Sequence, residues 1–100
     1  MIRLQELIEE NFKVQRSPRF YCDALAITTC RMNRITDFYC GMTIHQMVQD
    51  RIHQEAIFLL LETTMTAREI SFELGVSYPP HLTRAFKRIE GLGPKEFRKR

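Results

Sequence analysis

The feature that most constrains the fold of this chain is an internal repeat with a period of about 50 residues. A shift of 50 positions aligns apolar, arginine and glycine residues: Met32 with Leu82, Arg34 with Arg84, Gly41 with Gly91, Met42 with Leu92, and Met47 with Phe97. Just upstream, a shift of 49 positions aligns residues 25–28 with residues 74–77. Because 100 residues suffice for one ordinary domain, the repeat predicts a domain built from two copies of one supersecondary unit.

The first copy has the pattern of helix, tight turn and helix. Ser17 is a helix-capping residue and Pro18 fits the first helical position, so a short helix is expected to run to about residue 25. Residues 26–28 supply a tight turn, and a threonine at position 28 or 29 caps a second helix that runs to about Tyr39. Gly41 ends this second helix.

The second copy repeats this order with one extra turn residue. Thr66 and Glu69 have the spacing of a capping box, which opens a helix that runs through about residue 74. Residues 75–77 form the tight turn. Pro79 and Pro80 fit the first turn of the next helix, where a missing N–H group costs nothing, and that helix is expected to end before the following glycine.

Three further helices complete the prediction. Apolar residues recur at helical spacing in residues 3–12, and Pro94 starts a short last helix. Thr43 caps a helix of some 19 residues, about 28 Å long, with one apolar face: Ile44, Met47, Val48, Ile52, Ala56, Leu59 and Leu60. The sequence therefore predicts an all-α fold of about seven helices, with a first helix-turn-helix unit at about 3–42, a linker helix at about 43–61 and a second unit at about 66–100.

The second helix of each unit has an apolar face and a polar face. The faces expected to be buried hold Met32 and Ile35 in the first unit, and Leu82, Ala85, Phe86 and Ile89 in the second. The opposite faces are polar: Arg31, Asn33, Arg34 and Asp37, and His81, Thr83, Arg84, Lys87 and Arg88. Arg, Asn and Thr pair with base edges in the major groove of DNA, whereas Lys and Arg also meet phosphates. The linker helix would hold two such recognition helices one DNA turn, about 34 Å, apart.

Basic charge is concentrated in the C-terminal third of the chain. Residues 66–100 hold eight Lys or Arg and four Asp or Glu, whereas residues 1–65 hold seven and eight. The longest apolar run, residues 56–61, is far too short to span a membrane. The three histidines lie far apart, and the three cysteines lack metal-site and disulfide spacing. We therefore expect a polyanion as the partner and predict no catalytic site, no metal and no cofactor.

Residues 61–77, 82–88 and 91–98 together resemble the second half of the DNA-binding domain of the AraC/XylS family. Met32-Asn33-Arg34, Gly41 and residues 51–61 are similar to the first unit and linker helix of that family, so the resemblance covers essentially the whole chain. It implies a seven-helix domain whose two recognition helices enter adjacent major-groove segments on one face of the DNA. By position, the resemblance assigns base reading to seven residues: Cys30, Asn33, Arg34, Pro79, Pro80, Thr83 and Arg84.

The chain departs from the family pattern at two places. Pro79 and Pro80 stand where members often carry polar residues, which leaves base reading in the second unit to Thr83 and Arg84. In the first unit, Thr36 stands in place of a large apolar residue, so the packing of that unit has to differ.

These observations predict sequence-specific binding of double-stranded DNA and regulation of bacterial transcription initiation in the cytoplasm. We expect base contacts from four residues: Asn33, Arg34, Thr83 and Arg84. Flanking or phosphate contacts are expected from seven: Cys30, Arg31, Pro79, Pro80, His81, Lys87 and Arg88. RNA polymerase is a further expected partner. An effector or dimerisation domain, which usually precedes this domain in the family, is expected to lie outside this chain, and no contact with a membrane is expected.

One alternative stays open. Water requires a polar outer face of any exposed helix, and helix-turn-helix units also occur in proteins that never touch DNA. The chain would then be a protein-interaction module that contacts RNA polymerase or a partner regulator and binds DNA only through nonspecific attraction to phosphates. A preference for one DNA sequence over others separates the two functions.

Overall fold

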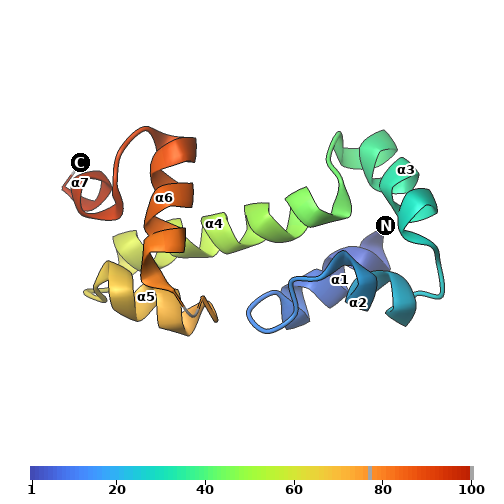
Figure 1. Cartoon of the computed structure of the whole chain (residues 1–100), viewed down its shortest axis with the longest axis horizontal. Coiled ribbons are helices and arrows are strands. Elements are labelled where there is room, and N and C mark those ends of the chain that lie inside the picture. The colour runs from blue at the N-terminus through green and yellow to red at the C-terminus, as the bar shows by residue number, and fades with distance from the viewer. Residues whose placement is uncertain (77, 100) are drawn as a thin grey trace. The chain divides into compact units, whose positions relative to one another are not determined.

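The computed structural model of the chain describes residues 1–76 and 78–99. Within these residues it contains seven helices and no strand: α1 (Ile2–Asn11), α2 (Pro18–Ala24), α3 (Thr29–Cys40), α4 (Ile44–Glu62), α5 (Ala67–Glu73), α6 (Pro79–Glu90) and α7 (Pro94–Arg98) (Figure 1). The all-α prediction is confirmed. Ser77, which the sequence places in the second turn, and Arg100 lie outside the described residues.

The helices begin where the capping residues predict. The hydroxyl oxygen of Thr28 accepts a hydrogen bond from the backbone N–H of Arg31 at 3.2 Å, which starts α3. At α5, the Thr66 hydroxyl accepts from the Glu69 N–H at 3.2 Å, and the Glu69 carboxylate accepts from the Thr66 N–H at 3.0 Å. The predicted capping box is therefore present, and it satisfies two N–H groups that the helix itself leaves free.

The chain divides into two compact units, Met1–Ile52 and His53–Arg100. The boundary falls inside α4, so the first part of this helix belongs to the first unit and the rest to the second. All seven residues of the predicted apolar face of α4 are buried. Helix α4 therefore contributes core residues to both units and is not merely a solvent-exposed linker.

In the first unit, side chains from α1, α2, α3 and the start of α4 form the core: Leu4, Leu7, Ile8, Phe12, Tyr21, Cys22, Met32, Ile44, Met47, Val48 and Ile52. Arg51 on α4 donates from Nε and Nη2 to the two carboxylate oxygens of Glu9 at 2.6 and 2.8 Å. The same guanidinium lies 4.3 Å from the centre of the Phe12 ring. These contacts attach α4 to α1 and to the residue that follows it.

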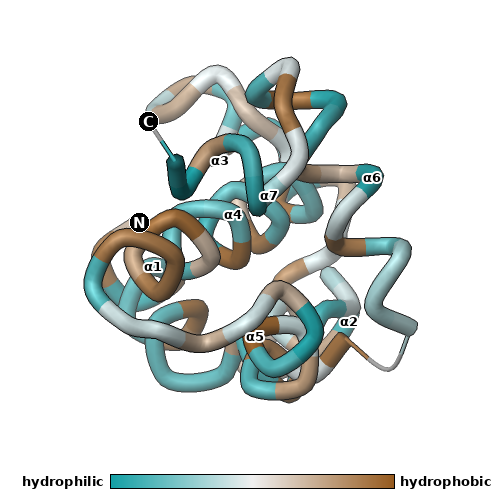
Figure 2. The backbone as a smooth tube through the Cα atoms, turned by 90° about the vertical axis from the view of Figure 1, so that its left-hand side faces the viewer, coloured by the Kyte–Doolittle hydropathy of each residue, from teal (hydrophilic) through white to brown (hydrophobic). Residues whose placement is uncertain are grey.

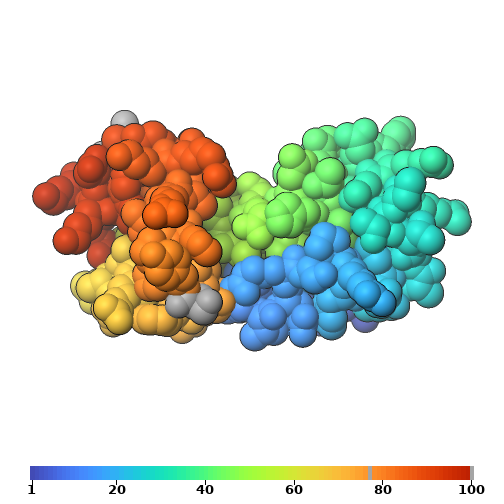
Figure 3. Space-filling view, viewed as in Figure 1, coloured from blue at the N-terminus to red at the C-terminus, as the bar shows by residue number. Residues whose placement is uncertain are grey.

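In the second unit, α6 packs against α5 and α7, and the atoms of these helices lie close together in Figure 3. Phe86 is central, because its ring lies 5.0 Å from that of His53 and 5.1 Å from that of Phe97. Arg98 donates to the Leu60 carbonyl oxygen at 3.0 Å, which attaches α7 to α4. The short last helix is therefore held by packing as well as by its own hydrogen bonds.

The two tight turns have the same hydrogen bonding. The Ile27 N–H donates to the Cys22 carbonyl at 3.0 Å, and the Val76 N–H donates to the Ser71 carbonyl at 2.8 Å. Each turn needs one residue in the left-handed region, which is Ala26 (φ 55°) in the first unit and Gly75 (φ 75°) in the second. Alanine adopts this conformation only with steric strain, whereas glycine adopts it freely.

The burial predicted for Ile89 is wrong, because 57% of its surface is exposed. The buried stripe of α6 advances by four residues at a time, from Leu82 to Phe86 and then to Glu90, so Ile89 falls beside it. Met32 and Leu82 are buried, as predicted, and Ile35 and Ala85 are half-buried. Apolar and polar residues alternate around the helices in Figure 2, as expected where each helix packs on one side only.

Candidate nucleic-acid interface

Helices α3 and α6 present the same surface pattern, position by position. Residues 31–41 and 81–91 have the same sequence of exposed, half-buried and buried classes at a shift of 50. The buried pairs are Met32 with Leu82 and Thr36 with Phe86, whereas Arg34 and Arg84 are both exposed. Each helix has 12 residues and ends at a glycine in the left-handed region. The repeat seen in the sequence is therefore a repeat of exposed surface as well as of fold.

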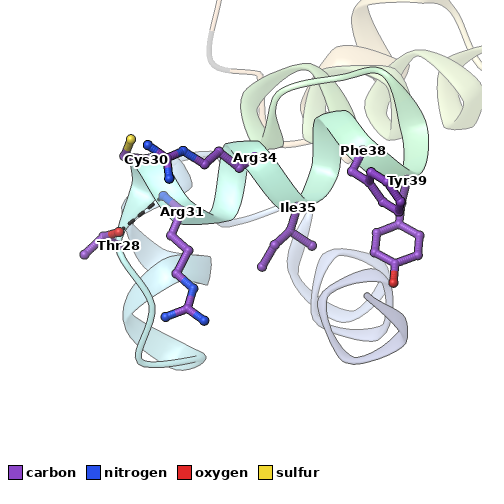
Figure 4. Close-up of a pocket in the computed structure, with 7 residues that line it drawn as sticks. All are labelled: Thr28, Cys30, Arg31, Arg34, Ile35, Phe38 and Tyr39. Carbon is purple, nitrogen blue, oxygen red and sulfur yellow. Dashed lines mark hydrogen bonds between the residues drawn. The ribbon is translucent and has the colours of Figure 1, made fainter.

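On α3, three of the residues expected to contact DNA lie along one open groove. Cys30, Arg31 and Arg34 are exposed and line a hollow with a volume of about 640 Å³, together with Thr28, Ile35, Phe38 and Tyr39. Figure 4 shows Thr28, Cys30 and Arg31 at the N-terminal end of the helix and Phe38 and Tyr39 at the other end. The groove therefore runs along the helix from two cations to a pair of aromatic rings.

Asn33, the remaining candidate on α3, has a structural contact. Its side-chain oxygen accepts a hydrogen bond from the Ile44 N–H at 3.0 Å, and the residue is half-buried. This bond satisfies one of the free N–H groups at the start of α4 and so connects the recognition helix to it. The expected base contact of Asn33 stays a prediction, and it would have to use the rest of the amide.

Thr36 fills the place of a large apolar residue without leaving a polar group unsatisfied. It is fully buried, and its hydroxyl donates to the Asn33 carbonyl oxygen at 3.2 Å. Its counterpart Phe86 is 1% exposed. The first unit thus has the same buried stripe as the second with a smaller side chain in it.

On α6, the candidate residues lie along the exposed face from the first turn to the last. Pro79 and Pro80 occupy the first turn and are half-buried, as is Thr83. Four further candidates are exposed: His81, Arg84, Lys87 and Arg88. The His81 ring packs edge-on against Tyr78 with 4.9 Å between ring centres. The exposed face therefore carries a cation in each of its last two turns, and Lys87 and Arg88 also suit the negative end of the helix dipole.

The arginines at the matching positions have no partner within the described part of the chain. Neither Arg34 nor Arg84 forms a hydrogen bond or an ion pair there, and both side chains extend into solvent. By contrast, Arg51 and Arg98 are held by Glu9 and by backbone carbonyls. Arg34 and Arg84 are thus free to pair with an external acceptor, such as a guanine edge or a phosphate.

Phe38 and Tyr39 are exposed residues that the sequence analysis did not single out. Their exposed fractions are 81% and 65%, and their rings pack edge to face at 5.1 Å. A signal for Phe38 was present, because it lies four residues after Arg34 and seven after Arg31 and so falls on the same helical stripe. The groove that they share with the two arginines makes them part of the candidate interface.

A family model described as "Helix-turn-helix domain" matches residues 21–100. The chain belongs to the AraC-type helix-turn-helix family. The match spans α3 to α7 and most of α2, and so includes both helices of the candidate interface of this AraC-type domain. No curated protein sequence matches the chain significantly.

Solved structures show the same fold. The C-terminal domain of the two-component response regulator yesN from Fusobacterium nucleatum aligns with a TM-score of 0.87 at 21% identity, over 95% of this chain and 93% of that one. The DNA-binding domain of AdpA, a global transcriptional factor solved in complex with a target DNA, aligns at 0.89 and 17% identity, over 98% and 88%. The xylose-binding transcription activator xylR aligns at 0.86 and 26% identity over 98% of this chain, which spans 26% of that longer protein.

Within residues 1–76 and 78–99, no helix is long and apolar enough to cross a membrane. The same residues contain no group of three or more His, Cys, Asp or Glu side chains placed to hold a metal ion.

Proposed function

We propose that this domain binds double-stranded DNA sequence-specifically, with α3 and α6 as recognition helices, and regulates transcription initiation in the bacterial cytoplasm. The observation that carries the proposal is the repeated exposed face, which has at the same position of each helix an arginine without a partner among residues 1–76 and 78–99. The DNA complex of the AdpA domain supports it, because that domain has the same fold. An exposed helix face with free arginines is suited to the major groove of DNA.

Each candidate has a role that its position allows. Arg34 and Arg84 are assigned to base edges, with bidentate pairing to guanine as the preferred contact. Thr83 and the free part of the Asn33 amide are assigned to neighbouring base edges. Flanking or phosphate contacts are assigned to the remaining candidates: Cys30, Arg31, Pro79, Pro80, His81, Lys87 and Arg88.

Two further partners belong to the same proposal. Regulation of initiation requires that the bound protein affects RNA polymerase, so a contact with the polymerase is part of the proposed mechanism. A separate effector or dimerisation domain would supply the signal, since this chain spans only about a quarter of the xylose-binding activator that it matches. DNA recognition itself is assigned to the two helices described above.

Selection of duplex DNA from a random library tests the proposal. The 100-residue chain is incubated with the library at about 0.15 M salt, where nonspecific attraction to phosphates is weakened. We expect one motif with two segments about 10 base pairs apart. Arg34→Ala should blur one segment and Arg84→Ala the other. Arg3→Ala, an exposed arginine on α1, is the matched control and should leave both segments intact.

The outcome decides between the two functions. Enrichment of no motif by correctly folded protein would contradict sequence-specific recognition by this chain. A motif that is weakened equally at every position by Arg84→Ala would instead make Arg84 a phosphate contact.

Protection of cysteines from alkylation provides a second test on the unmodified chain. Cys30 is exposed on the candidate face, Cys40 is half-buried at the other end of α3, and Cys22 is buried in the core. Saturating specific DNA should slow the alkylation of Cys30 by at least about tenfold and leave the rate at Cys40 nearly unchanged. Equal rates at Cys30 with and without DNA would show that the N-terminal end of α3 does not face the duplex.

A second candidate function is protein binding through the first unit. The exposed aromatic pair Phe38 and Tyr39 favours it, because large aromatic side chains are enriched at protein interfaces. This function predicts loose DNA binding without sequence preference, which the selection experiment detects directly.

A further inference from the structure

The aromatic end of the α3 groove is the part of the candidate interface whose function is least explained. Phe38 is 81% exposed, although burial of such a ring in the core would be favourable. It lines the same groove as Arg31 and Arg34, and its ring packs edge to face with that of Tyr39. The exposed ring is thus an apolar surface at the end of the groove that lies opposite Arg31 (Figure 4).

The matching turn of α6 has a different chemistry. Where α3 has Asp37 and Phe38, α6 has Lys87 and Arg88, all of them exposed. Lys and Arg at these positions can meet phosphates, but Asp37 repels a phosphate and Phe38 has no charge to offer. The last turns of α3 therefore cannot contact phosphates as those of α6 can. The contact that they can offer to DNA is an apolar one, from Phe38.

The position of Phe38 on the helix sets what it can reach. It lies four residues after Arg34, which corresponds to about 6 Å along the helix axis, at 1.5 Å per residue. Successive base pairs are stacked about 3.4 Å apart, so Phe38 falls within about two base pairs of the pair contacted by Arg34, and the full two are reached when the helix axis is parallel to the duplex axis. The apolar group that the major groove offers at a base pair is the C5-methyl group of thymine.

We propose that Phe38 recognises a thymine methyl group, so that the half-site of the first unit contains a thymine within about two base pairs of the base pair that Arg34 contacts. This inference rests on the proposed function and adds a specificity-determining residue to it. It assigns different modes of recognition to the two units. The first combines one arginine with an apolar contact, whereas the second combines one arginine with phosphate contacts from Lys87 and Arg88.

DNA is favoured over a protein partner by the continuity of the groove. Arg31 and Arg34, which are assigned to DNA, line the same hollow as Phe38, so a protein bound to the ring would compete with DNA for the two arginines. The two cations also match a polyanion. A protein ligand remains the rival occupant, and the experiment separates it from DNA.

Replacement of thymine by deoxyuridine tests the inference, because it removes only the methyl group. Duplexes with the selected motif are prepared with deoxyuridine at each thymine of the Arg34 segment in turn. At one position, unmodified protein should lose about fourfold in affinity, which is the effect of burying one methyl group. Phe38→Ala should bind the thymine and deoxyuridine duplexes equally, with the affinity that unmodified protein has for the deoxyuridine duplex. Circular dichroism checks the helix content of each variant.

A matched exchange between the two units sharpens the test. Phe38→Arg gives α3 the residue that α6 has at the equivalent position. This variant should lose the preference for thymine over deoxyuridine. It should also bind with a steeper salt dependence, by about 0.9 in the slope of log K against log salt, because one phosphate contact is gained. Tyr39→Ala should reduce the thymine preference only partly, since it removes a support of the Phe38 ring rather than the ring itself.

The outcomes distinguish this inference from the proposed function. A motif that is blurred by Arg34→Ala but shows no loss with deoxyuridine would overturn the inference and leave the proposed function standing. An Arg34 segment that contains no thymine would also overturn the inference alone. The same holds for a Phe38→Ala variant that binds DNA normally but no longer binds purified RNA polymerase. Enrichment of no motif at all would overturn both.

Discussion

Helix α3 of the first unit and helix α6 of the second bury equivalent positions but expose different chemistry. Both expose one arginine at the same place, Arg34 and Arg84. Beyond it, α3 continues with Asp37, Phe38 and Tyr39, whereas α6 continues with Lys87, Arg88 and Ile89. The buried stripe is constrained by the helix that it packs on, whereas the exposed face only has to stay solvated and to suit what binds to it. Differences on the exposed face therefore point to differences in recognition.

The comparison extends to the interior. At the centre of the buried stripe, the first unit has Thr36 and the second has Phe86, which contacts both His53 and Phe97. In the turns, the first unit has the strained Ala26 and the second has Gly75. The second unit thus has the larger central core residue and the less strained turn. We expect its helices to be the harder to unfold locally.

The largest expected effect concerns the centre of the buried stripe. Phe86→Ala should lower the free energy of unfolding by about 3–5 kcal/mol, because it removes a ring that is 1% exposed and leaves a cavity. Thr36→Ala, the matched change in α3, should cost about 1–2 kcal/mol, because it removes a methyl group and a hydroxyl bonded within the helix. Urea denaturation measures both values. Equal costs would contradict the central role of Phe86 in the second unit.

The next effect concerns the contact between α4 and the end of α6. His53 Nε2 lies 2.8 Å from a carboxylate oxygen of Glu90, and the histidine is 7% exposed. His53→Ala should cost about 1–3 kcal/mol, because it leaves a partly buried carboxylate without this partner. His53→Gln keeps an N–H donor and should recover part of the loss. Cys40→Ala, at the position of α3 that matches Glu90, should cost under about 1 kcal/mol.

Amide hydrogen exchange locates the effect of His53→Ala. The amides at the C-terminal end of α6 should lose protection before those of α3 do. If α3 and α6 lost protection together, the pair would stabilise the whole chain rather than the C-terminal end of α6.

The two tight turns give a third prediction, with opposite signs in the two units. Ala26→Gly should stabilise the chain by about 0.5–1 kcal/mol, because the relief of left-handed strain exceeds the extra backbone entropy of glycine in the unfolded chain. Gly75→Ala should destabilise it by about 1–2 kcal/mol for the reverse reason. Denaturation midpoints of the two variants measure these changes. Shifts of the same sign would show that the two turns are not equivalent.

Local signals in the sequence were sufficient to predict most of this fold. Pro18, the Thr66 and Glu69 capping box, and the glycines at positions 41 and 91 each act on a neighbouring turn of helix, so the positions of the helices follow from nearby residues. The period of 50 then predicted that α3 and α6 would match. The exposed cations Arg34 and Arg84 followed from the same pattern, because a residue two positions after a buried one lies on the other side of a helix.

Contacts between distant residues were beyond such reasoning. The bond from the Ile44 N–H to Asn33 joins residues 11 apart, and the His53 contact with Glu90 joins residues 37 apart. Both contacts depend on how the helices pack against each other. The residue types alone do not indicate which residues will be in contact. The burial of Ile89 was predicted wrongly for a related reason. Helix packing determined which of two neighbouring stripes on α6 became buried, and Ile89 does not lie on that stripe.

The smallest expected effect concerns the attachment of α4 to α1 in the first unit, and it depends on pH. The hydrogen bonds from Arg51 hold the pKa of Glu9 below its ordinary value of 4.5. The stabilisation from this pair is therefore complete well above pH 4.5 and is lost as the pH falls through the lowered pKa. Because the Glu9 side chain is 60% exposed, solvent screening limits the contribution to about 0.5–1 kcal/mol even with two hydrogen bonds. Glu9→Gln should lower the free energy of unfolding by this amount at pH 7 and by little at pH 3. Glu10→Gln, a change at an exposed neighbour, should lower it less at pH 7. Denaturation at the two pH values measures the difference, and an equal loss at both would show that the stabilisation by Glu9 does not depend on the charge of its carboxylate.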